Sequence, residues 1–238
     1  MTSSEKRPRL GYIIGSHVVY GKAVSRLLRS MSYSPIDLSS IIVQVNGSGV
    51  EHTQCIDGVR HYYMQGEVTS HFLSMVKFEI GKELDIHYWM YLNCTSECGL
   101  KFKELAEAGF NPDADATLAG GVLPLAACSE CKHGRAINDL AVYRYEYLLS
   151  EMKSIEELGN ANTHDIYHHW EGYLYGRAPV QAQYPKLDYH IDRGNLRDVY
   201  NTGILRATEY FAAVDLHRYK RNFGQLSDKP GEYDRAHL

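Results

Sequence analysis

The amino-terminal half of the chain alternates between short apolar runs and longer segments of helical periodicity. Residues 10–16, LGYIIGS, and 41–49, IIVQVNGSG, are apolar runs closed by small or polar residues, which is typical of buried strands followed by turns. Between them, residues 18–31 repeat apolar side chains at the i, i+3, i+4 and i+7 spacing of one helix face. Two further strands are predicted near 59–63 and over 87–92.

Helical segments also follow the two later strands. Residues 67–81 place their apolar side chains on one helical face, and residues 99–109 form a predicted helix that we expect to stop at Gly109, a residue type favoured at helix ends. Strands that alternate with helices at these spacings form βαβ units and a largely parallel sheet. The predicted fold class is therefore α/β, with a mostly parallel central sheet flanked by helices.

The second half of the chain is less regular. Residues 137–152 indicate a strand that passes into a helix, and residues 162–176 carry apolar and aromatic residues at helical spacing. Residues 199–224 contain a further strand and a basic, aromatic tail. No internal repeat and no Pro/Gly-rich linker divides the 238 residues, so we expect one domain.

Polar or small residues follow all four strands predicted in the first half. They occupy residues 15–17, 46–48, 65–67 and 93–97. Sheets of this class bind ligands outside the carboxyl ends of their strands. We therefore expect the chemistry of this protein at that edge.

The composition argues against a nucleic-acid partner. The formal net charge is −4, whereas nucleic-acid binding usually needs a basic stripe. The chain has 19 tyrosines beside only 6 phenylalanines, and a ring with a polar tip suits stacking on sugars or bases. Simple packing with the hydroxyl at the surface accounts for most of them.

No targeting segment and no membrane span is predicted. The first ten residues, MTSSEKRPRL, are polar and basic, and no apolar run approaches the roughly 20 residues needed to cross a bilayer. The five cysteines are odd in number and cannot all pair within one chain. We therefore expect a cytoplasmic protein with reduced thiols.

Common nucleotide and hydrolase motifs are missing from the sequence. It contains no G-x-x-x-x-G-K-[ST], no G-x-G-x-x-G and no G-x-S-x-G. Four other parts of the sequence are distinctive in their order and spacing. They are YIIGSHVVYGKAVSRLLRSM (12–31) with IIVQVNGS (41–48), YLNCTSECGLKFKEL (91–105), INDLAVYRYEYLL (137–149) and DVYNTGILRATEYFAAVDLHRYKRNFG (198–224). In these stretches the chain resembles the nucleotide-sugar glycosyltransferases of the GT-A fold, in particular the small capsid-glycosylating enzymes encoded by large DNA viruses.

The resemblance covers the chain almost from end to end, and it implies that the two halves of the chain have different roles. Residues 1–238 would form a single GT-A-like domain. Its donor-binding half would span 8–110, its acceptor-side half 111–225, and a tail 226–238. The implied partners are a nucleoside-diphosphate sugar donor and a glycan or glycoprotein acceptor.

The family pattern is altered where a metal ion is expected. In relatives the fourth strand ends in L-H-D-T, and the aspartate belongs to an acidic site for Mn²⁺ or Mg²⁺, hard cations that prefer oxygen ligands. This chain reads Leu92-Asn93-Cys94-Thr95, so Cys94 stands where the aspartate is expected. A thiol is a poor ligand for a hard cation, and Glu97 is the carboxylate of this loop that would substitute. We therefore predict weak or absent metal dependence.

The cysteines allow a second interpretation. Cys94-x₃-Cys98 and Cys128-x₂-Cys131, with His133 nearby, offer the ligand types of a structural zinc site. The 29 residues between the two pairs are more than compact zinc modules usually have. Buried cysteine without a metal is also common, and we favour that interpretation.

The resemblance also implies which residues contact the donor. Gly15, Ser16, Asn46 and Gly47 would lie against the nucleotide, with Asn46 offering both a donor and an acceptor to the base. The alternative for Asn46-Gly47 is a plain tight turn, and the two interpretations stay open. The remaining implied donor contacts are Glu67, Thr69, Asn93, Cys94, Asn138, His217 and Lys220; Glu67 would equally suit a helix start, where it complements the dipole.

An inverting transferase needs a general base that deprotonates the acceptor hydroxyl. The resemblance places this base at the start of the helix after the acceptor region, where HDIYHHWEGYL offers Asp165 and Glu171. We favour Glu171, which lies beside an aromatic residue and before a glycine. Asp139 is the second candidate for a direct role. A glutamate in an amphipathic helix is more often a solvated surface residue.

A basic cluster lies near the carboxyl terminus. His217, Arg218, Lys220 and Arg221 fall within five residues and would clamp a diphosphate. A solvated basic surface helix is the equally weighted alternative.

The sequence therefore predicts a glycosyltransferase that moves a sugar from a nucleoside-diphosphate donor to a glycan or protein hydroxyl. Two alternatives come from other classes. One is a catalytically inactive relative that binds the nucleotide or sugar, and the other is a zinc-stapled interaction protein.

Overall fold

The computed structural model describes residues 8–66, 72–119, 122–123, 135–136, 140–159, 174–185, 189–192 and 206–221. Within these residues, eight strands form one large sheet with the order β11-β7-β10-β5-β1-β2-β4-β3. These strands are β1 (Leu10–His17), β2 (Ile41–Asn46), β3 (His52–Ile56), β4 (Val59–Tyr63), β5 (Tyr88–Asn93), β7 (Ala116–Leu118), β10 (Ala141–Arg144) and β11 (Gln181–Gln183).

A smaller sheet with the order β12-β13-β14-β6 and a two-stranded pair complete the described strands. They are β6 (Ser96–Cys98), β12 (Tyr189–Asp192), β13 (Arg206–Phe211) and β14 (Leu216–Arg221), with β8 (Val122–Leu123) and β9 (Arg135–Ala136) as the pair. The helices are α1 (Gly21–Tyr33), α2 (Leu73–Lys77), α3 (Ile80–Leu84), α4 (Phe102–Gly109), α5 (Tyr145–Ser150) and α6 (Met152–Gly159), with short 3₁₀ turns η1 (Val18–Tyr20) and η2 (Leu38–Ser40).

The centre of the large sheet is parallel. Strand β1 pairs in parallel with β2 on one side and with β5 on the other, and β4 extends the parallel set beyond β2. Strands β10 and β3 join as antiparallel neighbours of β5 and β4. The predicted α/β class with a mostly parallel central sheet and flanking helices is therefore confirmed.

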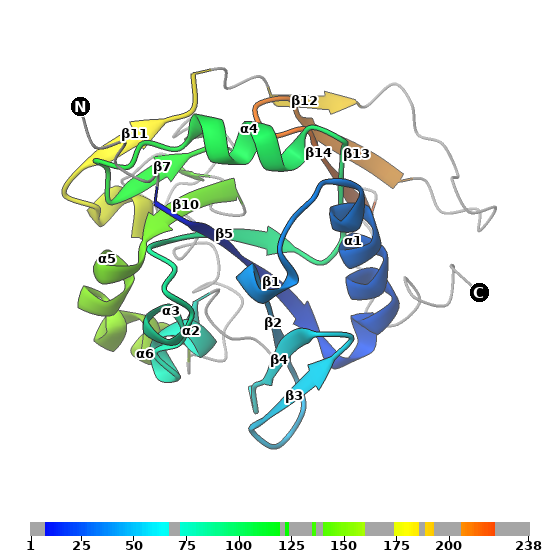
Figure 1. Cartoon of the computed structure of the whole chain (residues 1–238), viewed down its shortest axis with the longest axis vertical. Helices are drawn as coiled ribbons and strands as arrows, with labels where there is room; N and C mark the ends of the chain where they lie inside the picture. The colour runs from blue at the N-terminus through cyan, green and yellow to red at the C-terminus, as the bar shows by residue number, and fades with distance from the viewer. Residues whose placement is uncertain are drawn as a thin grey trace, which may run out of the picture.

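Two separate cores cover the two faces of the sheet, because successive side chains of a strand point to opposite faces. Tyr12 and Ile14 of β1 belong to a core shared with α1, α4 and the smaller sheet. Ile13, between them, belongs to the core under α2, α3, α5 and α6. Figure 1 shows α2, α3, α5 and α6 gathered on one side of β1 and β5 while α1 lies on the other.

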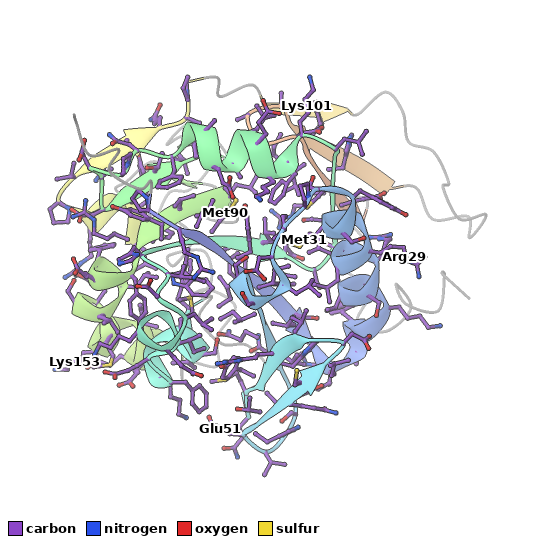
Figure 2. The ribbon with its side chains drawn as sticks, in the orientation of Figure 1. Arg29, Met31, Glu51, Met90, Lys101 and Lys153 are labelled. Atoms are coloured by element: carbon purple, nitrogen blue, oxygen red, sulfur yellow. The ribbon has the colours of Figure 1, made fainter. Side chains whose placement is uncertain are left out.

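The apolar face that the sequence predicts for the first helix is buried in α1. Val24, Leu27 and Met31, which share one helical face, are 5%, 0% and 1% exposed. Burying side chains of this size stabilises the fold by about 1.5–3 kcal/mol each. In Figure 2, Met31 of α1 and Met90 of β5 both lie in the interior, whereas Arg29, on the other side of α1, lies at the periphery.

The helix predicted over 67–81 is two short helices in its described part. Residues 67–71 lie outside the described residues, and α2 and α3 occupy the rest. Between them, Glu79 has a φ of 47°, in the left-handed region that interrupts a right-handed helix. The periodicity predicted the buried face correctly, but it gave no sign of this break.

Strand β3 is absent from the sequence prediction. It forms a hairpin with β4 through Asp57 and Gly58, whose φ angles are 50° and 81°. Positive φ at both central residues is the geometry that Asp-Gly turns favour between antiparallel strands. The Asp57-Gly58 pair was a turn signal in the sequence. The side chains of β3 are mostly exposed, however, so the strand lacks the alternation of apolar and polar residues by which a half-buried strand is recognised.

Gly109 ends α4 as predicted, but for a different reason. It does not have the positive φ of a typical glycine cap. Instead, a Cβ atom at this position would overlap the ring of Tyr184. That ring is held in place because the Tyr184 hydroxyl donates to the carbonyl oxygen of Ala106, at 2.7 Å.

None of the helices in the described part of the chain is both long and apolar enough to span a bilayer.

We predict that Gly109→Ala lowers the free energy of unfolding by about 1–3 kcal/mol, because the added methyl group must displace a buried, hydrogen-bonded ring. The matched control is Gly21→Ala, where a Cβ would meet nothing within 4 Å. This control should be neutral or stabilising by up to about 1 kcal/mol. Urea unfolding curves measure both, and equal midpoints for the two variants would contradict the packing role of Gly109.

Candidate functional site

The carboxyl ends of β1, β2, β4 and β5 meet at one edge of the large sheet. The backbone N–H of Cys94 donates to the carbonyl oxygen of Gly15 at 3.0 Å, and that of Gly47 donates to Gly66 at 2.8 Å. Four chain segments are thereby joined, and we call residues 15–17, 46–48, 64–66 and 93–95 the strand-end rim. The predicted gathering of polar strand ends at one edge is confirmed.

The rim includes the point at which the order of the strands in the large sheet reverses. From β1 the chain moves outward through β2 to β4 on one side, and it then returns to place β5 on the other side of β1. Such a reversal leaves a crevice between the neighbouring strands at their carboxyl ends, and α/β sheets bind ligands there. The rim at β1 and β5 is the point at which the strand order reverses.

His17 and Asn46 face the same side of the sheet and are register partners in the β1–β2 ladder. Ser16 pairs with Val45 and points to the opposite face, where it is 7% exposed and its hydroxyl donates to the carbonyl of His17 at 3.4 Å. Of the two implied donor contacts, Asn46 therefore lies on one face and Ser16 on the other. His17 is the polar neighbour of Asn46.

Gly47 is fixed by two constraints. Its φ of 77° is in the region that favours glycine, and a Cβ would overlap the His17 ring. His17 in turn accepts a weak hydrogen bond at Nδ1 from the backbone N–H of Val19, at 3.4 Å. The tight turn at Asn46-Gly47 and the close approach of the His17 ring thus occur at the same residue.

Gly15 has a similar role under Tyr91. A Cβ atom at Gly15 would overlap the Tyr91 hydroxyl, so the ring can cross the end of β1 only because this residue is glycine. Tyr91 is 4% exposed and its ring centre lies 5.9 Å from that of Phe72. The Tyr91 hydroxyl therefore belongs to the floor of the rim.

Asn93 holds the turn that follows β5. Its Oδ1 accepts hydrogen bonds from the backbone N–H of Thr95 at 3.0 Å and from the Thr95 hydroxyl at 2.9 Å. This is an Asx turn, in which a side-chain amide replaces a backbone carbonyl. The oxygen of Asn93 is engaged within the protein, and its amide nitrogen is not used by this turn.

Cys94 and Cys98 are core side chains. They are 3% and 6% exposed, they carry free thiols, and they belong to the core under α1. Burial raises the pKa of the Cys98 thiol, which keeps it neutral. The other proposed zinc ligands, Cys128, Cys131 and His133, lie outside the described residues.

The segment after the rim is held by α1. The backbone N–H of Cys98 donates to the Ser30 hydroxyl oxygen at 2.9 Å. The hydroxyl of Ser34, the residue that follows α1, lies 3.1 Å from the carbonyl of Gly99 and 3.2 Å from that of Leu100. Helix α1 therefore fixes the path of the loop that leaves β5.

The smaller sheet holds the same segment from its other side. Glu97 and His217 are register partners in the β6–β14 ladder, so two residues singled out far apart in the sequence lie opposite each other. Beyond the ladder, Asp215 accepts backbone hydrogen bonds at its carbonyl from Gly99 (2.7 Å) and at its carboxylate from Lys101 (3.0 Å). Gly99 is required here because a Cβ would overlap this carboxylate.

Tyr210 helps to hold Asp215 in place beside the segment that follows β5. The Tyr210 hydroxyl donates to Asp215 Oδ1 at 3.0 Å, and its ring centre lies 4.5 Å from that of His217. Burial, together with the hydrogen bond to the carboxylate, raises the pKa of Tyr210. The hydroxyl therefore remains a hydrogen-bond donor at neutral pH.

The basic cluster at the carboxyl terminus is on a strand, which corrects the surface-helix alternative. Residues 216–221 form β14, and alternate residues of a strand point to opposite faces. His217 and Arg218 thus face different sides, and Lys220 pairs with Ala207 in the β13–β14 ladder. The contact of His217 and Lys220 with a diphosphate stays a prediction.

The described rim does not fit an Mn²⁺ or Mg²⁺ site. Within the residues that the structure describes, no three His, Cys, Asp or Glu side chains lie close enough to hold a metal ion. The Asn93 oxygen is engaged in its turn, and Cys94 is buried in the core. The low metal dependence expected from the sequence stays a prediction.

Helix α1 brings a positive end toward the rim. It begins at Gly21, immediately after β1 and η1, and its first turn contains no acidic residue. The amino-terminal end of a helix carries a partial positive charge and free N–H groups. An anionic group at the end of β1 would be stabilised there.

Several implied site residues lie outside the described residues. They are Glu67, Thr69, Asn138, Asp139, Asp165 and Glu171. Conversely, His17 and Tyr91 were not predicted as site residues. His17 had a signal, since it ends the first strand, but the position of Tyr91 over Gly15 follows from the pairing of β1 with β5.

No protein-family model and no curated protein matches the sequence. Solved structures do match, with low identity and TM-scores. One is S. aureus TarS in complex with UDP-GlcNAc, at 9% identity and a TM-score of 0.43 over 74% of this chain and 56% of that one. Another is the glycosyltransferase GlyE of Streptococcus pneumoniae TIGR4, at 10% identity and a TM-score of 0.44 over 74% and 45%.

A third is a glycosyltransferase involved in the glycosylation of the major capsid of PBCV-1, at 14% identity and a TM-score of 0.41 over 74% of this chain and 82% of that one. The chain spans between 35% and 57% of the length of the matched TarS and GlyE chains. At these identities, they assign no role to a residue of this chain.

We predict that Asn93→Ala lowers the free energy of unfolding by about 1 kcal/mol, because two donors of Thr95 lose their acceptor. The matched variant Asn93→Asp keeps an acceptor oxygen and should retain most of the stability. Urea unfolding midpoints distinguish the two. If both variants unfold like the wild type, Asn93 does not hold this turn.

Proposed function

We propose that this protein transfers a sugar from a nucleoside-diphosphate sugar to a hydroxyl group of a glycan or a protein. The observation that carries the proposal is the reversal of strand order, where the ends of β1 and β5 lie side by side and are joined by the bond from Cys94 to Gly15. Sheets of this class bind ligands outside the carboxyl ends of their strands at such a point. The substrate class, a nucleoside-diphosphate sugar, is the one that the family resemblance of the sequence implies.

In this proposal the nucleotide base contacts the β2 side of the rim. Asn46 carries one side-chain acceptor and two donors, which match an imide or amide edge of a base. His17, its register partner, lies beside it on the same face. The positive φ of Gly47 and the His17 ring that packs against it fix the turn beside Asn46.

The diphosphate then lies at the start of α1. The helix end and its N–H groups favour an anion there, and no acidic side chain stands in the first turn. Residues 15–17, 46–48, 64–66 and 93–95 contain no carboxylate, whereas Glu97 lies two residues further along on β6 and Glu67 lies outside the described residues. Neutral and partly positive groups would therefore stabilise the leaving diphosphate.

For an inverting reaction, the acceptor hydroxyl attacks the anomeric carbon from the side opposite the leaving group. The bond between that carbon and the diphosphate oxygen breaks, the nucleoside diphosphate leaves, and a base takes the hydroxyl proton. Glu171 is the proposed base, with Asp139 as the second candidate. Both assignments rest on the family resemblance, since both residues lie outside the described residues.

One observation favours the alternative of an inactive relative that still binds the donor. Asn93 and Cys94 occupy the strand end where the family has an aspartate, and both are engaged in turn and core contacts. A protein of this kind would bind the nucleotide without turnover. Release of free nucleoside diphosphate from a sugar donor distinguishes the two functions.

We predict that at least one of UDP, GDP, TDP and CDP raises the melting temperature. Ligand at 100 times its dissociation constant adds about 2.7 kcal/mol to stability, which a thermal-shift assay detects easily. Asn46→Ala should weaken binding roughly tenfold through loss of its base contacts. Gln54→Ala, which removes an exposed amide from the edge strand β3, is the matched control and should bind normally.

If millimolar concentrations of all four nucleotides fail to stabilise the protein, both the transferase and the inactive-relative proposals fail. The same assay tests the metal. Adding Mn²⁺ or a chelator should change nucleotide affinity by less than about tenfold. A larger loss with chelator would show that Glu97 or another group completes a metal site.

We predict that Glu171→Gln lowers turnover by roughly 10² to 10⁴ while donor affinity stays nearly unchanged, provided that the product shows inversion. Glutamine keeps the shape of the side chain but cannot accept the proton. Glu157→Gln, an exposed change on α6, is the control. Wild-type turnover in the Glu171→Gln enzyme would exclude this residue as the base, and Asp139 and Asp165 would then be tested in the same way.

A further inference from the structure

The turn between β13 and β14 is bonded to the segment that follows β6. Asp215 in this turn accepts a hydrogen bond at its carbonyl oxygen from the N–H of Gly99, at 2.7 Å. Its Oδ2 accepts from the N–H of Lys101 and its Oδ1 from the Tyr210 hydroxyl, both at 3.0 Å. Hydrogen bonds to a charged acceptor are roughly twice as strong as those between neutral groups. One carboxylate therefore joins two distant parts of the chain.

Both sides of this contact are fitted to each other. Asp215 has a φ of 50°, in the left-handed region that few residues other than glycine, asparagine and aspartate adopt. Opposite it, a Cβ at Gly99 would overlap the Asp215 carboxylate. A backbone conformation of this kind persists only where the surrounding contacts hold it. The contact is therefore a specific one, which other residue types at these two positions would disturb.

Residues 99–101, which lie between the buried side chains of Cys98 and Phe102, depend on polar contacts for their position. Leu100 at their centre is 79% exposed, so apolar burial does not hold it. On one side, the Ser34 hydroxyl lies 3.1 and 3.2 Å from the first two carbonyls of the segment. On the other side, the turn between β13 and β14 accepts from its first and last N–H groups. Removing the second set would release the segment without opening the core.

The contact stands where it can set the register between β14 and β6. Strand β14 begins immediately after Asp215, and its first residue pairs with the residue before Gly99. From there the antiparallel ladder runs to the pair of Arg218 with Ser96. A slip of one residue would turn every side chain of a strand to the opposite face. The bonds of Asp215 oppose such a slip at the first step of the ladder.

The far end of β14 is directed toward the strand-end rim. Strand β6 begins at Ser96, directly after the rim residue Thr95, and β14 runs antiparallel to it. Residues 219–221 therefore continue past the start of β6 in the direction of the rim. We call residues 218–221 the basic end of β14, since three of the four are arginine or lysine.

We propose that Asp215 is a positioning residue for donor binding, which holds the basic end of β14 beside the diphosphate. The inference rests on the proposed function, since it concerns how the same rim recognises a nucleoside diphosphate. Asp215 does not touch the ligand and acts through the register of β14. Its own charge has the wrong sign for a direct role, because a carboxylate near a diphosphate weakens binding. Positioning and direct electrostatics therefore predict opposite effects of its removal.

The test compares binding of UDP, GDP, TDP and CDP with binding of the bare nucleosides by titration calorimetry. Asp215→Ala should weaken diphosphate binding roughly tenfold through loss of a charged contact and leave nucleoside binding within about twofold. Lys220→Gln should give the same loss, and the double variant should lose no more than either, as expected of residues that act as one unit. Tyr210→Phe, which removes one of the three bonds and disturbs folding less, should give a smaller loss in the same direction.

The matched control is Asp57→Ala. Asp57, like Asp215, is an aspartate with a φ of 50° in a turn between antiparallel strands, but it precedes β4, at the edge of the large sheet opposite the rim. It should leave binding of both kinds of ligand unchanged. Amide hydrogen exchange without ligand tests the structural step by itself. Asp215→Ala should speed exchange in residues 96–101 and 216–221 by roughly tenfold relative to β1, and Asp57→Ala should not.

Equal or tighter diphosphate binding in Asp215→Ala would overturn the proposal, and so would an equal loss for diphosphate and nucleoside. Unchanged exchange in residues 96–101 and 216–221 would also overturn it, whatever the binding result. If the wild type binds no nucleoside diphosphate, the proposed function fails and the donor-binding role of Asp215 fails with it. Normal diphosphate binding in the wild type with no change in Asp215→Ala removes only the positioning role.

Discussion

The hydrogen-bonding of β1 on both sides is the constraint from which the rest of the structure follows. Its neighbours β2 and β5 fix its register, and its two faces are covered by separate cores. Gly11 and Gly15, on one face, lie under Trp89 and Tyr91 of β5, and a Cβ at either glycine would collide with the aromatic side chain. The two strands therefore fit together closely, and this fit sets where their ends stand.

The loop after β5 depends on contacts from distant parts of the chain. Ser30 of α1 and Ser34, which follows α1, hold it on one side, and Asp215, in the turn between β13 and β14, holds it on the other. The loop is thus positioned by tertiary hydrogen bonds more than by its own sequence. Glu97 and His217 come to lie opposite each other as a result of this arrangement.

The sequence predicted the elements whose periodicity reports burial directly. Strands β1, β2, β4 and β5 and helix α1 were found because one or both of their faces are apolar, and the polar rim followed from their ends. It did not predict β3, whose side chains are exposed, or the helix break at Glu79, which is a backbone conformation. Tyr91 over Gly15 was also missed, since cross-strand register is decided only when strands pair.

The length of β1 has a consequence for the electrostatics of the rim. Its eight residues, at about 3.3 Å each, set the rim and the opposite edge of the sheet about 26 Å apart. Salt at physiological concentration screens exposed charges over roughly 8 Å. Charged side chains near the start of β1, such as Arg9, therefore change the potential at the rim very little, and that potential is set by the groups at the carboxyl ends of the strands.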